Sequence, residues 1–230
     1  MKNINHFLVA IAIAGAFSAC KKDDAAEVDL GYNYFPKNIG HWIEYQVDSI
    51  RVSLSFGVLD TTVYTYPLRE MLVEDFTDGE GRACQRVVRY LRDDNNTWLP
   101  KDVWWQTRDN VRAERSEENL RRVKLIFPPR AGTEWDTNAP NTEDAFGLEY
   151  ENVDQPITIN GLTFENTVSV VSTFEDNFVQ SRHYQECYAK GVGMIVHVMD
   201  SVNHEWNFET NNWNSYDRWY VKYAVTGYGN

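Results

Sequence analysis

Residues 157–164 read Ile-Thr-Ile-Asn-Gly-Leu-Thr-Phe, and this stretch points most directly to the fold class. Apolar and polar residues alternate on both sides of Asn160-Gly161, as they do in a strand with one buried face. Asn-Gly is the dipeptide best suited to a two-residue hairpin loop, because both positions require a positive φ. The stretch therefore predicts two antiparallel strands joined by a tight turn.

Similar strand signals recur along most of the chain. β-branched and aromatic residues are frequent, turn residues separate the runs, and helical periodicity is nearly absent. These features predict an all-β fold, an antiparallel and strongly curved sheet that forms an open barrel or a sandwich, with little helix. Only residues 116–122 could form a short turn of helix. The expected strands are residues 43–47, 50–56, 62–74, 82–92, 98–107, 120–127, 146–153, 164–174, 181–188, 194–201 and 218–226.

Three local patterns predict which side chains share a face of the sheet. The apolar alternation of residues 43–47 changes phase in residues 50–56, which predicts a β-bulge or a sharp bend between the two runs. The last strand carries large apolar residues at every second position from Trp219 to Val225, so they lie on one face. The adjacent Trp104 and Trp105 must point to opposite faces.

The chain has a formal net charge of −12 at pH 7, which argues against nucleic acid as a partner. Its densest basic run, from Arg112 to Lys124, is interrupted by Glu114, Glu117 and Glu118 and is interpreted as an exposed face. A chain of 230 residues suits one large β domain, which we expect to occupy residues 34–230.

The N-terminus has the order of charged, apolar and small residues that is typical of a secretory signal peptide. Lys2 supplies the charge, residues 7–17 are mostly apolar, and two small residues precede Cys20. The apolar run is too short to span a bilayer. Residues 1–19 are therefore predicted to be a signal peptide, and residues 20–33 a lipidated tether.

A cysteine at the cleavage position resembles the lipobox of bacterial lipoproteins, although Phe17 stands where the family usually has Leu or another aliphatic residue. The resemblance implies cleavage before Cys20 and acylation of its thiol, which would anchor the protein to a membrane. The following Lys22-Asp23-Asp24 is similar to the export signal of Bacteroidota surface lipoproteins, and implies a place on the outer membrane facing the medium. The alternative is a secreted protein cut after Ala19, with Cys20 as a chance thiol.

Two further motifs resemble uncharacterised lipoproteins of the Bacteroidota. In the first, Tyr34-Phe35-Pro36 is followed by Gly40 and Trp42, and the second reads YAKGVGMI in residues 188–195. Both motifs are expected to be structural, with glycines that permit a bent hairpin. The family has no agreed activity, so the resemblance implies a fold and a location rather than a function.

Cys84 and Cys187 remain once Cys20 is acylated. An export compartment permits a disulfide between them, and an even number of thiols favours one. Two buried free cysteines are the other alternative, because a domain of this size needs no long-range bridge.

No catalytic or cofactor motif is found in the sequence. H-E-x-x-H, G-x-S-x-G and a glycine-rich phosphate loop are absent, so no catalytic residue, cofactor or metal site is assigned. His197 and His204 are separated by seven positions with Asp200 between them, a spacing that suits a strand histidine and a loop histidine better than a metal centre. An enzyme is the less favoured class, and a hydrolase would require ionisable residues clustered in a cleft.

Aromatic residues alternate with polar ones between His204 and Trp219. Trp206, Trp213 and Tyr216 offer flat faces beside amides and carboxylates, a combination that suits the apolar face and the hydroxyl rim of a sugar. The alternative is a long hairpin with a polar tip and buried rings.

These observations favour a surface-anchored, non-catalytic lipoprotein that binds an extracellular ligand, with a glycan as the preferred class. One alternative is a structural or assembly subunit with an outer-membrane protein partner. A second is an envelope carrier that encloses a lipid or another apolar molecule.

Overall fold

The computed structural model describes residues 28–55 and 58–230, which form one antiparallel sheet of twelve strands. The predicted signal peptide and Cys20 lie outside the described residues. Around the sheet the order is β6-β5-β4-β3-β2-β1-β12-β11-β10-β9-β8-β7, so the chain meanders and its first and last strands pair. After the short turn η2 (Tyr32–Tyr34), the strands are β1 (Trp42–Ser55), β2 (Val58–Thr77), β3 (Ala83–Arg92), β4 (Trp98–Arg108), β5 (Arg112–Glu117), β6 (Leu120–Ile126), β7 (Glu134–Asp136), β8 (Gly147–Ile159), β9 (Leu162–Ser172), β10 (Gln180–Ala189), β11 (Gly193–Asn207) and β12 (Asn212–Gly229).

The sheet curves until its two edge strands almost meet. The backbone N–H of Val123 in β6 donates to the carbonyl of Thr137, just after β7, at 2.8 Å. The carbonyl of Val123 in turn accepts from Trp135 Nε1 at 3.0 Å and from Thr137 Oγ1 at 2.9 Å. The predicted all-β, strongly curved antiparallel sheet is confirmed as a nearly closed barrel.

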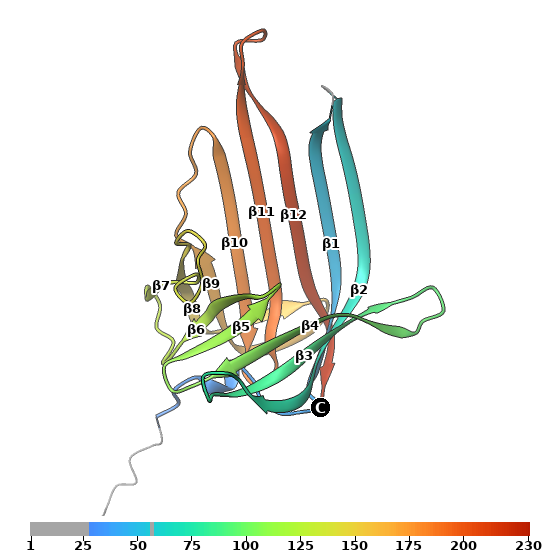
Figure 1. Cartoon of the computed structure of the whole chain (residues 1–230). Coiled ribbons are helices and arrows are strands. Elements are labelled where there is room, and N and C mark those ends of the chain that lie inside the picture. The colour runs from blue at the N-terminus through green and yellow to red at the C-terminus, as the bar shows by residue number, and fades with distance from the viewer. Residues whose placement is uncertain (1–27, 56–57) are drawn as a thin grey trace, which may run out of the picture.

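Five strands continue well beyond the barrel. Residues 58–67 of β2 pair only with β1, and residues 180–184 of β10 pair only with β11. Figure 1 shows these strands standing tall while β3 to β6 lie across the lower part of the molecule. We call this extension the upper sheet. It consists of residues 48–55, 58–67, 180–184, 199–207 and 212–220.

The core lies in the barrel and is rich in tyrosine. Tyr45 and Tyr150 are almost fully buried among aliphatic residues such as Leu68, Leu148 and Ile195. Each of these tyrosines donates its hydroxyl to a carbonyl, that of Met194 at 2.9 Å and that of Ile126 at 2.7 Å, respectively. Buried tyrosines therefore contribute large apolar faces without leaving an unpaired polar atom.

The tight hairpin predicted at Asn160-Gly161 is confirmed. Ile159 pairs with Leu162, and both turn residues have positive φ, 50° and 80°. The expected helical turn at residues 116–122 is wrong, because β5 and β6 form a second hairpin there. Its turn residues Glu118 and Asn119 also have positive φ, which a helix does not allow.

The bulge expected between residues 47 and 50 is not found either. β1 pairs with β2 without a register shift from Trp42 to Ser55. A bulge is found instead between β1 and β12. Glu44 pairs with Gly227 and Tyr45 pairs with Val225, so one residue of β12 is left unpaired within the barrel. The change of apolar phase instead marks the point at which β1 leaves the barrel, so its inner face no longer meets a core.

Cys84 and Cys187 are free thiols, and both are buried. Cys84 Sγ lies 3.5 Å from the carbonyl oxygen of Arg82, and Cys187 Sγ lies 3.5 Å from Ser169 Oγ. The disulfide alternative is therefore wrong for this structure, and the alternative of two buried free cysteines is the one observed. The physical reason is position, because each thiol packs in its own local environment on a different pair of strands.

Candidate ligand-binding cleft

A cleft of about 480 Å³ opens where the upper sheet leaves the barrel. Its volume lies within the range of about 300–1,000 Å³ found for small-molecule sites. The inner faces of β10, β11 and β12 form one wall, and the β5–β6 hairpin and the segment between β7 and β8 form the other. Its principal lining residues are Glu117, Arg122, Asn138, Phe146, Arg182, Tyr184, His197 and Trp219.

Strand register brings the aromatic wall together. Tyr184 pairs with Met199, Met199 pairs with Val221, and Ser201 pairs with Trp219, so these side chains share the inner face. Val221 is 7% exposed in the core, whereas Trp219 is 45% exposed at the cleft. The prediction that Trp219 to Val225 share one face is thus confirmed. Along β12 this face lies in the core at Val221 and lines the cleft at Trp219.

The floor of the cleft is a group of buried and half-buried ionisable side chains. Glu186 is 1% exposed and accepts hydrogen bonds from Lys124 Nζ at 2.5 Å and Tyr188 OH at 2.6 Å. Lys124 Nζ also lies 3.3 Å from a carboxylate oxygen of Glu117 and 3.2 Å from the hydroxyl of Tyr184. We call Glu117, Lys124, Tyr184, Glu186 and His197 the floor cluster.

Lys124 and Glu186 of the floor cluster hold each other in their charged forms. Burial by itself raises the pKa of Glu186, but the nearby charge of Lys124 and the hydrogen bond with His197 outweigh it and hold that pKa well below its usual range. For Lys124 the signs are reversed. Burial by itself lowers its pKa, but the negative charges of Glu117 and Glu186 more than offset this effect. The result is a buried ion pair rather than two neutral groups.

His197 connects the floor cluster to the open cleft. Its Nδ1 lies 3.2 Å from Glu186 Oε1, and its ring packs edge-on against Tyr184 and Tyr223, with centroids 5.4 Å away in both cases. Its side chain is 19% exposed and lines the cleft. Among the described residues, Nε2 has no hydrogen-bond partner, so this nitrogen is available to a ligand.

Two guanidinium groups in the wall retain free donors. Arg122 Nη1 donates to Asn138 Oδ1 at 2.7 Å, and Arg122 Nε lies 3.9 Å from a carboxylate oxygen of Glu117. Arg182 packs between the rings of Phe146 and Phe174, 5.4 and 5.2 Å from their centroids. Within residues 28–55 and 58–230, Arg182 forms no ion pair and its buried Nε has no partner. The cleft therefore offers hydrogen-bond donors beside aromatic faces.

A second polar group lies deeper in the barrel and is structural. Glu70 is 5% exposed and accepts from Arg115 Nη1 at 2.8 Å, while Arg89 Nη2 donates to the hydroxyl of Tyr223 at 2.9 Å. Burial, partly opposed by the charge of Arg89, raises the pKa of Tyr223 to about 12. These contacts join strands that are not neighbours in the sheet, β2 to β5 and β3 to β12, across the barrel interior.

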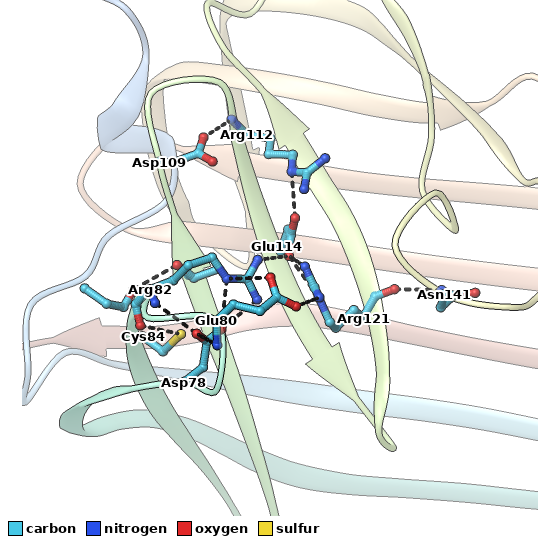
Figure 2. A network of polar contacts seen from close by, with 11 residues as sticks. Asp78, Glu80, Arg82, Cys84, Asp109, Arg112, Glu114, Arg121 and Asn141 are labelled. Carbon is cyan, nitrogen blue, oxygen red and sulfur yellow. Dashed lines mark hydrogen bonds and ion pairs between the residues drawn. The ribbon is translucent and has the colours of Figure 1, made fainter.

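The basic run from Arg112 to Lys124 is not an exposed face, which corrects the prediction. Glu114 is 1% exposed and is surrounded by the guanidinium groups of Arg82, Arg112 and Arg121 at 3.0, 2.6 and 2.8 Å. Figure 2 shows these three arginines converging on Glu114, with Asp78 and Glu80 beside them. The carboxylates balance the arginines, so this group stabilises the outer face of β3 to β6 and offers no unpaired charge to a ligand.

The predicted aromatic contacts lie at the far end of the β11–β12 hairpin. Trp206 pairs directly with Trp213, and their rings meet edge-on with centroids 5.5 Å apart. Phe178 stacks on Trp213 at 6.1 Å. Tyr216 is the extra residue at a bulge in β12, next to the pairing of His204 with Ser215. The structure thus brings Trp206 and Trp213 together, and none of the three predicted residues lines the cleft.

The adjacent tryptophans of β4 behave as predicted and point to opposite faces. Trp104 lies against Arg89 inside the barrel, 3.8 Å from the guanidinium carbon to the ring centroid. Trp105 contacts Phe76 on the outer side, with centroids 6.5 Å apart. Both faces of the sheet are therefore covered at this point.

Neither histidine of the 197/204 pair belongs to a metal cluster. His197 faces the cleft, whereas His204 Nδ1 lies 3.2 Å from Ser215 Oγ on the neighbouring strand. No group of three or more His, Cys, Asp or Glu side chains in the described part of the chain is arranged to hold a metal ion. Over those same residues, no helix combines the length and the apolar character needed to cross a membrane.

Reasoning from the sequence missed the floor cluster, although one signal for it was present. Glu186 stands between Tyr184 and Tyr188 on the same face of a predicted strand, which otherwise faces the core. A carboxylate at such a position requires a buried cation. The partner Lys124 is 62 residues away in sequence, so only the folded chain identifies it.

Comparison with known proteins gives little further information. No protein-family model and no curated protein matches the chain. A crystal structure of a "putative lipoprotein" from Parabacteroides distasonis ATCC 8503 is similar over 85% of this chain and 98% of that chain, with 11% sequence identity and a TM-score of 0.38. A likeness this distant transfers no function.

Proposed function

We propose that this protein is a lipid-anchored binding protein that takes an extracellular glycan into the cleft at the mouth of the barrel. The single observation that carries the proposal is the exposed ring of Trp219, which faces the hydrogen-bonding side chains of Arg122 and Asn138 across a cleft of about 480 Å³. Pockets of this kind combine apolar walls with a few placed polar groups.

The chemistry of the cleft suits a sugar better than an apolar ligand. Trp219, Tyr184 and Phe146 offer flat faces for the apolar side of a sugar ring. Around them, arginine, amide and carboxylate groups can pair with hydroxyl groups. The charged floor cluster would leave a lipid tail in contact with buried ions, so the apolar-carrier alternative is less favoured.

The placement of the cleft is compatible with an anchor at Cys20. The lipobox-like sequence and the Lys22-Asp23-Asp24 run support acylation and display on the outer membrane. The first described residues and η2 lie at the base of the molecule, at the opposite end from the tip of β11–β12 (Figure 1). A membrane near the base would therefore leave the upper sheet and the cleft facing the medium.

Replacement of the cleft tryptophan tests the proposal. We expect Trp219→Ala to abolish binding of the glycans that wild-type protein captures on a glycan array, with at least about a tenfold loss of affinity by calorimetry. Trp213→Ala is the matched control, because this tryptophan is also partly exposed but lies at the tip. If glycan binding survives Trp219→Ala and is lost in Trp213→Ala, the binding site lies at the tip of the β11–β12 hairpin and not in the cleft.

A hydrolase is the second candidate, and the His197–Glu186 pair is the observation that favours it. A carboxylate that holds Nδ1 of an imidazole leaves Nε2 to act as a general acid or base. His197→Gln separates the two functions. Retained binding with loss of bond cleavage indicates an enzyme, whereas a bound glycan recovered intact from wild-type protein supports binding alone.

A further inference from the structure

β2 presents a long open edge. Residues 58–67 pair with β1 on one side, and β3 joins β2 only from Leu68 onward. Across residues 28–55 and 58–230, the backbone of this segment makes no hydrogen bond apart from its pairing with β1. In Figure 1 this half of β2 forms the margin of the upper sheet, with no strand on the side away from β1. An unpaired row of N–H and C=O groups is a template for another strand.

The other open margin of the upper sheet is protected. The backbone N–H of Arg182 in β10 donates to Asp176 Oδ1 at 2.9 Å, and that of Gln180 donates to Asn177 Oδ1 at 3.0 Å. The segment before β10 therefore satisfies donors that an added strand would need. This margin is closed to pairing by its own chain.

The free end of β4 is protected in a different way. Residues 98–103 pair only with β3, and they include Pro100 and Lys101. A register shift between Arg89 and Tyr90 also disturbs the ladder at this point. Proline, lysine and bulges are the devices by which natural sheets prevent edge-to-edge pairing.

The open edge of β2 carries none of these devices along its length. Residues 58–66 read VLDTTVYTY, a run with a single charge at Asp60 and with Pro67 only at its end. Val58, Val63 and Tyr64 are exposed by 60% or more. β-branched and aromatic residues favour strand pairing, and exposed side chains of this kind have no role in the core.

We propose that this edge pairs with the same edge of a second copy of the chain, antiparallel and centred on Thr62. This register pairs all of residues 58–66, and it places Asp60 opposite Tyr64 rather than opposite another charge. Each chain has a net charge of −12, so a nearly neutral strand is where two copies repel each other least. The symmetric contact joins two upper sheets into one continuous sheet.

Sedimentation velocity of the full chain carrying Cys20→Ser, which removes the acylation site, tests the assignment. We expect a concentration-dependent dimer, and we expect Leu59→Lys together with Val63→Lys to raise its dissociation constant about tenfold or more. Both side chains are exposed, so the fold should tolerate the changes. Val103→Lys, an exposed valine on the protected edge of β4, should leave the dimer intact.

A cysteine at the centre of symmetry supplies a second readout. In the same background, Thr62→Cys should form a disulfide-linked dimer on mild oxidation, because two opposed strand residues have their Cα atoms within the range of a disulfide. A chain that stays monomeric at every concentration overturns the assignment, as does a dimer that the two lysines leave unchanged. If the chain stays monomeric but binds a peptide of residues 58–66, the edge is open to other partners, and the proposed pairing of two copies is ruled out.

Discussion

Lys124 and Glu186 show how single residues shape the cleft. Both are nearly fully buried, and they meet at 2.5 Å at the floor. A buried ion pair is expensive to form, and replacing it by apolar residues is often neutral for stability. Its presence below an open cleft therefore suggests a role in placing His197, whose Nδ1 is held by Glu186.

Breaking this ion pair on one side should be costly. Lys124→Met leaves the carboxylate of Glu186 buried without its cation, so we expect a loss of about 3–5 kcal/mol in the free energy of unfolding. Urea denaturation followed by tryptophan fluorescence measures the loss. Arg51→Met is the matched control, because the exposed pair of Arg51 with Asp217 should contribute less than about 1 kcal/mol.

Replacing both partners of the ion pair distinguishes an effect on stability from an effect on ligand binding. Lys124→Met with Glu186→Leu should recover most of the lost stability, since no charge remains buried. If the floor cluster also positions His197, this double variant should fold and still bind glycan more weakly than wild type. If Lys124→Met alone is as stable as wild type, water must reach the carboxylate of Glu186, and the floor cluster is hydrated rather than dry.

At the scale of elements, turn residues explain why the hairpins were predictable to different degrees. Asn160-Gly161 is a strong local signal, and the structure confirms the two strands that it joins. Glu118-Asn119 makes the same kind of turn with a poorer residue at its first position. The local sequence of residues 116–122 therefore leaves a helical turn open, whereas the chain forms a second hairpin there.

The hairpin at residues 157–164 allows a direct test of turn conformation. Gly161 has a φ of +80°, and a Cβ added there would meet no atom within 4 Å. Gly161→Ala should therefore lower the free energy of unfolding through backbone strain alone, by about 1–2 kcal/mol. Gly79→Ala is the control for denaturation measurements, because that position is equally open and has no positive φ, so its stability should change little.

At the scale of the whole molecule, the core and the upper sheet differ in how firmly they are held. Val47, Leu68 and Val225 are fully buried in the barrel, whereas the upper sheet carries exposed residues such as Leu59 and Val63. Few buried apolar contacts imply low local stability. We therefore expect the lower half of these tall strands (Figure 1) to be held more firmly than the upper half, which should open separately.

Hydrogen exchange within a single hairpin should reveal this difference. We expect the amides around the pairing of Val196 with Ala224 to exchange only through global unfolding, and those around Trp206 and Trp213 to exchange faster through local opening. Exchange followed by mass spectrometry at peptide resolution gives both rates in one sample. Equal protection along β11 and β12 would mean that the upper sheet is as stable as the barrel.

The sequence by itself determined the fold class, most strand positions, the tight hairpin and the common face from Trp219 to Val225. These properties depend on residues that are close in sequence, because alternation and turn chemistry act over only a few positions. Local alternation changes phase where β1 leaves the barrel, but by itself it predicts a bulge or a bend rather than the end of the core. It also placed Trp219 on one face with Val225 without showing that this face opens into a cleft.

Only the tertiary structure decided the cleft, the floor cluster and the open edge of β2. Lys124 and Glu186 come from different parts of the chain, and barrel closure brings them together. Arginines from several strands bury Glu114 on the outer face, and Cys84 and Cys187 remain free thiols on different pairs of strands. Each outcome depends on which strands become neighbours and how far they extend, and this is a property of the closed sheet that no local run of residues encodes.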